Sequence, residues 1–124
     1  MSDLLEQKSN SVKSQAKQNK QDNKMSYENV EMRIIQWAEA RRIIPNSTPE
    51  TQLLKTMSEL GELADATIKK DKDGIIDGVG DVMVCMVNYC ALQDIDLVSC
   101  MESAYDTIKN RTGTLLPNGV FLKD

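Results

Sequence analysis

The stretch KTMSELGELADATIKKDKDGIIDGVGD, residues 55–81, decides how the rest of the chain is interpreted. Glu59 and Glu62 are three residues apart and Asp77 and Asp81 are four apart, so each pair lies on one face of a helix. The polar run KKDKDG between the pairs predicts a short turn joining two antiparallel helices. All four carboxylates would then face one gap.

Four carboxylates in one gap repel each other unless a cation lies among them. A set of ligands that is all oxygen favours a hard ion, so we predict Mg²⁺, or alternatively Mn²⁺, as the cofactor. A Glu-x-x-Glu pair alone is usually a solvated helix face. Asp81 shifts that balance because it lies inside the nearly continuous apolar run of residues 75–92, where a carboxylate needs a partner. A buried salt bridge and a helix cap are the alternatives for Asp81. The predicted metal ligands are Glu59, Glu62, Asp77 and Asp81.

The composition narrows the class of protein. A chain of 124 residues suits one domain, and a net charge of −4 argues against a nucleic-acid partner. The absence of histidine removes the commonest general base and the usual zinc ligand. Cys85, Cys90 and Cys100 have no metal-ligand spacing and predict reduced core residues of a cytoplasmic protein. No apolar run of membrane-spanning length and no signal peptide is expected, and we therefore predict no membrane partner.

The chain divides into two parts. Residues 1–24 are rich in Gln, Asn, Ser and Lys and are expected to be a disordered or fraying extension, whereas residues 25–124 form the helical domain. We predict an all-α fold, a four-helix bundle that ends in a short C-terminal β-hairpin around Asn118-Gly119. Because a lone hairpin is marginal, it should pack on the helices or on another subunit.

Each predicted helix has a start signal or an inner apolar face. The first begins after the cap Ser26, with Val30, Ile34, Trp37 and Ala38 facing inward. The second runs from Pro49 to about Lys70 after the cap Thr48, and residues 43–48 before it form a loop. The third, from Ile75 to about Leu92, is apolar nearly all round and should be central. The fourth follows the cap Asp96, with Met101, Tyr105 and Ile108 facing inward.

Several further side chains are candidate substrate contacts, each with a plain structural alternative. Lys55 is either a surface partner of Glu59 or a phosphate contact. Cations after the fourth helix either complement its dipole or clamp phosphate. The single tryptophan is either core or a stacking surface for a base. The candidate set is Lys55, Trp37, Asn88, Lys109 and Arg111.

From about Val30 to Lys123 the sequence resembles the MazG-like branch of the all-α nucleoside triphosphate pyrophosphohydrolases. The resemblance is carried by SELGELADA (58–66), DGVGDVMV (77–84) and AYDTIKNRTGTLLPNGVFLK (104–123). It implies a helical fold, Mg²⁺ held by Glu-Glu-x-x-Glu and Glu-x-x-Asp motifs, and cleavage of a nucleoside triphosphate to monophosphate and pyrophosphate. It also implies a homodimer or a homotetramer built as a dimer of dimers.

Carried over by position, Glu59, Glu62 and Asp81 match family acids and are the predicted catalytic residues. The chain departs from the pattern at Ser58 and Gly78, where the family has acids, although Asp77 offers a carboxylate one residue before Gly78. These departures leave the number of metal ions open. They also leave the alternative of a catalytically weakened nucleotide-binding or host-interaction protein of the same fold. The compact form resembles small phage-encoded members.

Overall fold

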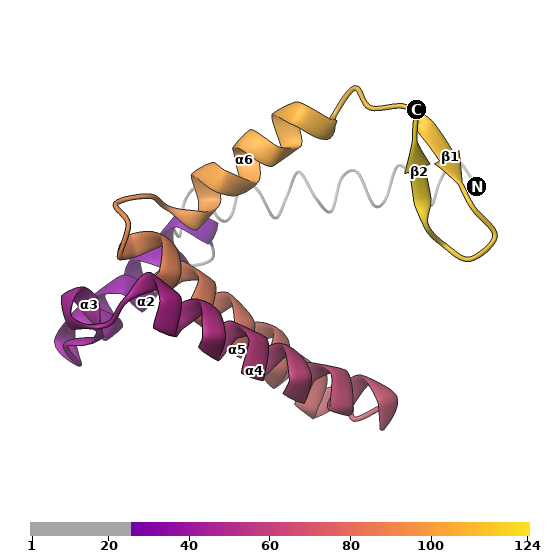
Figure 1. Cartoon of the computed structure of the whole chain (residues 1–124). Helices are drawn as coiled ribbons and strands as arrows, with labels where there is room; N and C mark the ends of the chain where they lie inside the picture. The colour runs from indigo at the N-terminus through magenta and orange to yellow at the C-terminus, as the bar shows by residue number, and fades with distance from the viewer. Residues whose placement is uncertain (1–25) are drawn as a thin grey trace, which may run out of the picture.

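The computed structural model of this protein describes residues 26–124, so the predicted N-terminal extension of residues 1–24 lies outside the described part. The prediction of a helical fold with a C-terminal hairpin is confirmed (Figure 1). In chain order the elements are α2 (Tyr27–Ala40), α3 (Ile43–Asn46), α4 (Pro49–Ile68), α5 (Lys72–Ala91), α6 (Leu97–Ile108), β1 (Gly113–Leu115) and β2 (Phe121–Lys123).

The predicted caps fix the starts of three helices. In each case the side-chain oxygen of the cap accepts a hydrogen bond from a backbone N–H three residues later, which satisfies a donor that has no partner inside the helix. The pairs are Ser26 with Asn29 at 3.1 Å, Thr48 with Thr51 at 3.1 Å and Asp96 with Ser99 at 2.9 Å.

Two predicted boundaries were wrong. The third long helix, α5, begins at Lys72 rather than Ile75, because the Asp71 carboxylate accepts the N–H of Gly74 at 3.1 Å and caps the helix earlier. The predicted loop of residues 43–48 contains the short helix α3, which is interrupted by extended backbone at Ile44. The side-chain amide of Asn46 donates to the Arg42 carbonyl at 2.9 Å and closes this turn.

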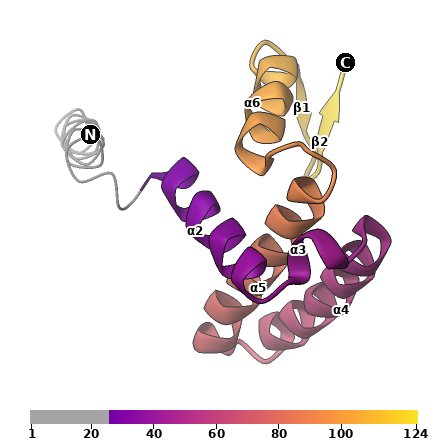
Figure 2. The ribbon, with the colours of Figure 1, turned by 90° about the vertical axis from the view of Figure 1, so that its left-hand side faces the viewer.

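The body of the molecule is an antiparallel pair of long helices, α4 and α5, with α2 packed against α5 (Figures 1 and 2). Its buried apolar residues are few and small: Ala38, Ala66, Cys85, Val87 and Cys90. Among the described residues no large side chain is completely buried. A single chain therefore closes only a small core.

Several side chains that were predicted to face inward are exposed in the single chain. Val30 and Trp37 on α2 are 39% and 43% exposed. On α6, Met101, Tyr105 and Ile108 are each about half exposed or more, because α6 runs away from the α4–α5 pair instead of along it (Figures 1 and 2). The predicted inward positions of these side chains are therefore wrong within one chain.

One polar contact anchors α6 to the body. The Glu31 carboxylate, on α2, accepts the backbone N–H of Leu97, the first residue of α6, at 2.7 Å. Glu31 is only 9% exposed. This negative charge lies at the positive end of the α6 dipole, which is a favourable place for a carboxylate.

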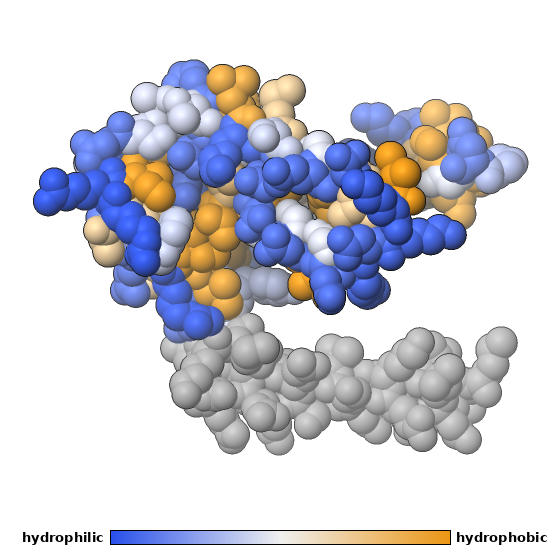
Figure 3. Space-filling model, turned by 90° about the horizontal axis from the view of Figure 1, so that it is seen from below, coloured by the Kyte–Doolittle hydropathy of each residue, from blue (hydrophilic) through white to orange (hydrophobic). Residues whose placement is uncertain are grey.

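The predicted hairpin is present, with Thr114 paired to Leu122 in an antiparallel register. It contacts no other described element of the same chain, so the predicted packing on the helices is absent. Four apolar side chains of the hairpin are more than half exposed: Leu115, Val120, Phe121 and Leu122. Seen from below, apolar surface is visible both on the hairpin at the right and on the helical body at the left (Figure 3).

The apolar character of α5 has a second consequence. By length and composition alone, this helix is the one among the described residues that could cross a membrane, whereas the sequence had predicted no such stretch. The core helix of a soluble protein passes the same test, so the observation carries little weight.

Candidate active site

The α4–α5 pair brings the predicted acidic residues together. α4 carries Glu59 and Glu62, and α5 carries Asp77 and Asp81. The two helices approach closely at Gly78, where an added Cβ would lie 3.3 Å from the Leu63 Cα. This close contact holds the two acidic faces beside each other, as the sequence had predicted.

Two of these carboxylates have a raised pKa because acidic neighbours lie close to them. The pKa of Glu62 is raised, first by the hydrogen bond that its protonated form makes with Glu59 and then by the Glu59 charge. The pKa of Asp81 is raised by loss of solvent and by the charges of Asp77 and Glu59. We call Glu59, Glu62, Asp77 and Asp81 the acidic cluster.

Lys55 is the cation of this cluster. Its ammonium lies 3.5 Å from Glu59 Oε1, one helical turn away on α4, and it lowers the pKa of both Glu62 and Asp81. Lys55 is the surface partner of Glu59, which was one of its two predicted roles. Its side chain is 59% exposed, so the other role, a contact with phosphate, stays a prediction.

The second oxygen of Glu59 has no partner. The Glu59 side chain is only 14% exposed, and its Oε2 is buried without a hydrogen bond. A buried carboxylate oxygen without a donor is costly unless a cation or a proton satisfies it.

The donor set fits a hydrated hard cation. Within residues 26–124, no three acidic or cysteine side chains stand close enough to enclose a metal ion by themselves. Mg²⁺ does not require such a cage, because it keeps several waters and is commonly held by one or two carboxylates and by substrate phosphates. The unpartnered Glu59 oxygen and the mutual repulsion across the acidic cluster are what such an ion would relieve.

A cavity of about 440 Å³ opens beside Asp81. It is lined by two residues of α5, Asp81 and Val84, and by four residues of α2, namely Val30, Arg33, Ile34 and Trp37. The same cavity thus meets an acid of the cluster, an indole ring and a guanidinium. The guanidinium carbon of Arg41 lies over the Trp37 ring, 4.6 Å from the ring centroid.

Arg33 was missed by the sequence analysis. It lies four residues before Trp37, so the helical period places both on one face of α2. That spacing was the available signal.

Asn88 lies seven residues after Asp81 on α5 and is 3% exposed. Its Oδ1 is buried without a hydrogen-bond partner among the described residues. The side chain is therefore an unsatisfied polar group in the apolar interior. Its predicted contact with a substrate stays a prediction.

Lys109 and Arg111 are not brought to the acidic cluster. They follow the distal end of α6, an element that does not contact α4 (Figure 1). Lys109 instead pairs with Asp106 of its own helix at 3.3 Å. Within one chain, the prediction that these cations share a site with Glu59 and Glu62 was wrong, because the direction of α6 separates them.

The cysteines follow the prediction in part. Cys85 and Cys90 are buried, and loss of solvent raises the pKa of both thiols, that of Cys90 to about 11. Cys100 is exposed on α6, so its predicted place in the core was wrong.

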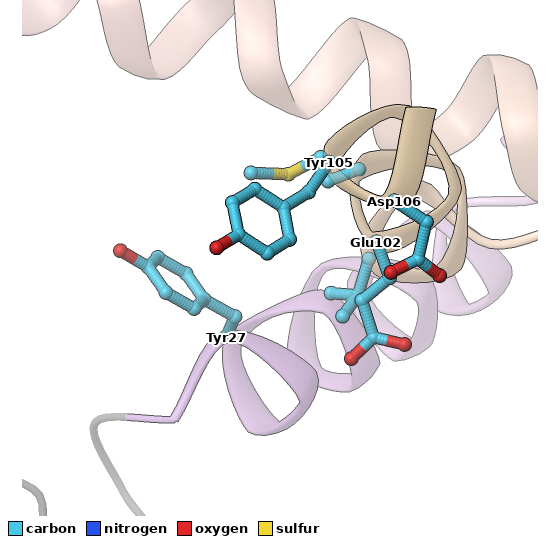
Figure 4. A pocket seen from close by; sticks show the side chains of 6 residues that line it. Tyr27, Glu102, Tyr105 and Asp106 are labelled. Atoms are coloured by element: carbon cyan, nitrogen blue, oxygen red, sulfur yellow. The ribbon is translucent and has the colours of Figure 1, made fainter. Parts of the chain in front are cut away.

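A second cavity, of about 510 Å³, lies between α2 and α6. Tyr27 and Tyr105 face each other across it, while the carboxylates of Glu102 and Asp106 point away from the two rings (Figure 4). It shares no lining residue with the cavity at Asp81.

The chain is similar in sequence to known proteins. The chain is 43% identical over 65 residues to an "Uncharacterized 18.2 kDa protein in rep-hol intergenic region" of Haemophilus phage HP1 (strain HP1c1), a match that covers 52% of this chain and 40% of that protein. The chain thus matches less than half the length of this relative. No solved structure matches significantly. The family model described as the MazG nucleotide pyrophosphohydrolase domain matches residues 47–115, which include the whole acidic cluster. The chain belongs to the MazG nucleotide pyrophosphohydrolase family.

Proposed function

We propose that this protein is a Mg²⁺-dependent pyrophosphohydrolase that converts a nucleoside or deoxynucleoside triphosphate, or a related nucleotide, to a monophosphate and pyrophosphate. The observation that carries the proposal is the acidic cluster on α4 and α5, with its unpartnered buried Glu59 oxygen, beside a cavity that also contains Trp37. Membership of the family supports the same reaction class.

Each side chain has a distinct part. The carboxylates of Glu59, Glu62, Asp77 and Asp81 would hold one or two hydrated Mg²⁺ ions, each ion bound by one or two of them and by the substrate phosphates. Held there, Mg²⁺ would neutralise charge on the triphosphate and lower the pKa of an attacking water. Trp37 offers a flat surface on which a base stacks.

The cations would orient the phosphates. Arg33 lines the same cavity as Asp81, and guanidinium groups bind phosphate oxygens in a bidentate manner. Lys55, which lies on α4 beside Glu59, would balance negative charge on the bound triphosphate.

The reaction is a hydrolysis at the α-phosphorus. The water oxygen forms a bond to this phosphorus, and the bond between the phosphorus and the α–β bridging oxygen breaks. The electron pair leaves with pyrophosphate, and a carboxylate of the acidic cluster takes the water proton.

The working form is proposed to be a homodimer or homotetramer. The support is the small core of the single chain and the many large apolar side chains that it leaves exposed.

The test is a product analysis. The full chain would be incubated with a panel of nucleoside triphosphates and Mg²⁺, and the products would be separated by anion exchange. Monophosphate with pyrophosphate is expected, whereas diphosphate with inorganic phosphate would contradict the proposed bond. Glu62→Gln should abolish turnover, and Asp65→Asn, an exposed acid of α4 outside the cluster, is the matched control.

One observation favours a second function. The family has an acid where this chain has Gly78, which is buried against Leu63. The chain therefore lacks one of the carboxylates that the family uses at this position. A weakened member would bind nucleotide, or a host protein, without turning nucleotide over. Measurable nucleotide binding with unchanged triphosphate in the same assay would favour this alternative.

A further inference from the structure

Two cysteines meet at the corner where α5 ends and α6 begins. Cys90 lies in the last turn of α5, Cys100 lies in the first turn of α6, and both are free thiols. Their side chains are in contact. The pKa of Cys90 is raised to about 11, first by burial and then by the neighbouring Cys100 and the hydrogen bond between the two thiols. A disulfide forms only between cysteines whose side chains already approach each other, and this pair meets that condition.

The backbone of the corner holds the two cysteines near each other. The Cys90 carbonyl accepts the N–H of Gln93 at 2.9 Å and the N–H of Ile95 at 3.1 Å. On the α6 side, the Asp96 carbonyl accepts the N–H of Cys100 at 3.1 Å. Each cysteine therefore belongs to a hydrogen-bonded turn that borders the corner, so the contact between the thiols is built into the backbone.

The two thiols differ in their access to solvent. Cys90 is 3% exposed, whereas Cys100 is exposed and lines a cavity of about 460 Å³. The carboxylates of Asp94 and Asp96 belong to residues that line the same cavity. A small oxidant therefore reaches Cys100 first. The negative charge around Cys100 disfavours anionic disulfides, so a neutral peroxide is the oxidant that suits this site.

The first turn of α6 is where a covalent bond would change the molecule most. No residue of α6 is buried, and the helix leaves the body at an angle (Figure 2). Its polar anchor is the hydrogen bond from the Leu97 N–H to Glu31 at 2.7 Å. A segment with so few buried contacts opens locally at low cost. A bond between α5 and α6 would oppose that opening.

We propose that Cys90 and Cys100 form a redox-sensitive pair, which hydrogen peroxide converts into an intrachain disulfide that ties α6 to α5. The bond is a modification site of the helical corner. It shares no residue with the acidic cluster, and it does not depend on the proposed hydrolysis.

The oxidation occurs in two steps. The Cys100 sulfur first attacks one oxygen of the peroxide and the O–O bond breaks; the other oxygen leaves as hydroxide and takes the thiol proton, which gives water and a sulfenic acid. The Cys90 sulfur then attacks the Cys100 sulfur and the S–O bond breaks, so that hydroxide leaves and combines with the Cys90 proton as a second water. The two thiols lose two electrons, and these reduce one peroxide to two waters.

The test is to treat the full chain with an equimolar amount of hydrogen peroxide and to locate the bond by mass spectrometry. The intact mass should fall by that of two hydrogen atoms. A protease that cuts before aspartate, combined with chymotrypsin, which cuts after Tyr89, separates all three cysteines. The peptide of residues 90–93 should then be linked to that of residues 96–105. Because the bond closes a loop of about ten residues, the Tm should rise by about 10 °C, and dithiothreitol should reverse the rise.

Three serine variants complete the test. Cys100→Ser changes an exposed side chain and should form no disulfide and show no peroxide-dependent rise in Tm. Cys90→Ser should leave the Cys100 sulfenic acid without its partner, so that dimedone labels it. Cys85→Ser is the matched control, because Cys85 is also a buried cysteine of α5 but bonds to Thr56. This variant should form the same linked peptides as the wild type.

Several results would overturn the proposal. Peroxide-treated wild type could retain both thiols, carry Cys100 only as a sulfinic acid, or join the Cys100 residues of two chains. A linked pair without a rise in Tm would show that the bond does not hold α6, and an equal rise in Cys100→Ser would show that the stabilisation has another cause. Hydrolysis of nucleotides is measured in neither arm, so failure of the proposed function would leave these results unchanged.

Discussion

Gly78 on α5 lies so close to Leu63 on α4 that a Cβ added to the glycine would be 3.2 Å from the Leu63 Cβ and 3.3 Å from its Cα. Few real Cβ atoms make contacts this short, and one of the neighbours is backbone. The family pattern has an acid at this position. Here α4 lies where the side chain of that acid would be. The glycine therefore both removes the carboxylate and allows the two helices to pack closely.

Restoring the family acid should therefore harm the protein. Gly78→Asp is expected to lower the free energy of unfolding by about 1–3 kcal/mol, because the side chain must push α4 and α5 apart. It should also reduce turnover, since the two halves of the acidic cluster separate. Gly80→Asp is the matched control, because nothing lies within 4 Å of a Cβ added there. Urea denaturation compares the two. A Gly78→Asp variant with undiminished stability and increased turnover would contradict the account.

The contact between Glu31 and Leu97 predicts how α6 is attached to the rest of the chain. Glu31→Ala leaves the first N–H of α6 without its acceptor at 2.7 Å, and the expected loss is about 2 kcal/mol of unfolding free energy. Glu31→Gln retains an acceptor oxygen and should lose less. Thermal unfolding gives the ranking of wild type, Gln and Ala. Equal stability of the Ala and Gln variants would show that this hydrogen bond does not hold α6 in place.

Local chemistry made the helices of this chain predictable. Ser26, Thr48 and Asp96 were identified as caps from residue type and from the apolar pattern that follows, and each makes the expected bond. The convergence of the acidic residues followed from helical spacing and one short turn. These features depend on residues close in sequence, where periodicity and capping decide the conformation.

The direction of α6 could not be predicted in the same way. It depends on the left-handed backbone at Asp94 and on a hydrogen bond between Glu31 and Leu97, which are 66 residues apart. Nothing in the local pattern indicates either feature. Because the direction of α6 was not predicted, Lys109 and Arg111 were wrongly placed beside the acidic cluster of their own chain. For the same reason Met101 was wrongly placed in the core.

Lys55 should set the acid limb of the pH–rate profile. Its charge lowers the pKa of Glu62 and Asp81, while Glu59 raises both and Asp77 raises that of Asp81. Removing the ammonium in Lys55→Gln leaves only the raising influences, so both carboxylates stay protonated to higher pH and bind the metal less well there. The acid limb of kcat/KM should move to higher pH. Lys69→Gln, an exposed lysine at the end of α4, is the control. An unmoved acid limb in the Lys55 variant would separate this lysine from the cluster.

The raised pKa of Asp81 also predicts that its charged carboxylate lowers the stability of the metal-free protein. Because the folded chain holds the Asp81 proton more tightly than the unfolded chain, this residue favours folding fully below the usual pKa of 3.8, and that contribution is lost as pH rises through the folded pKa. At pH 7 the metal-free wild type therefore carries an unfavourable charge.

Asp81→Asn removes that charge at nearly constant size. We expect the metal-free variant to have a higher Tm than the wild type at pH 7, a difference that disappears below pH 3.8, where Asp81 is protonated in both states. Turnover should fall by about 10²-fold or more, and Mg²⁺ should raise the Tm of the wild type but not that of the variant. Calorimetry of both proteins with and without Mg²⁺ measures these Tm values. If Mg²⁺ raises the Tm of both proteins equally, Asp81 does not hold the ion; if the metal-free variant is less stable than the wild type at pH 7, the carboxylate is structural.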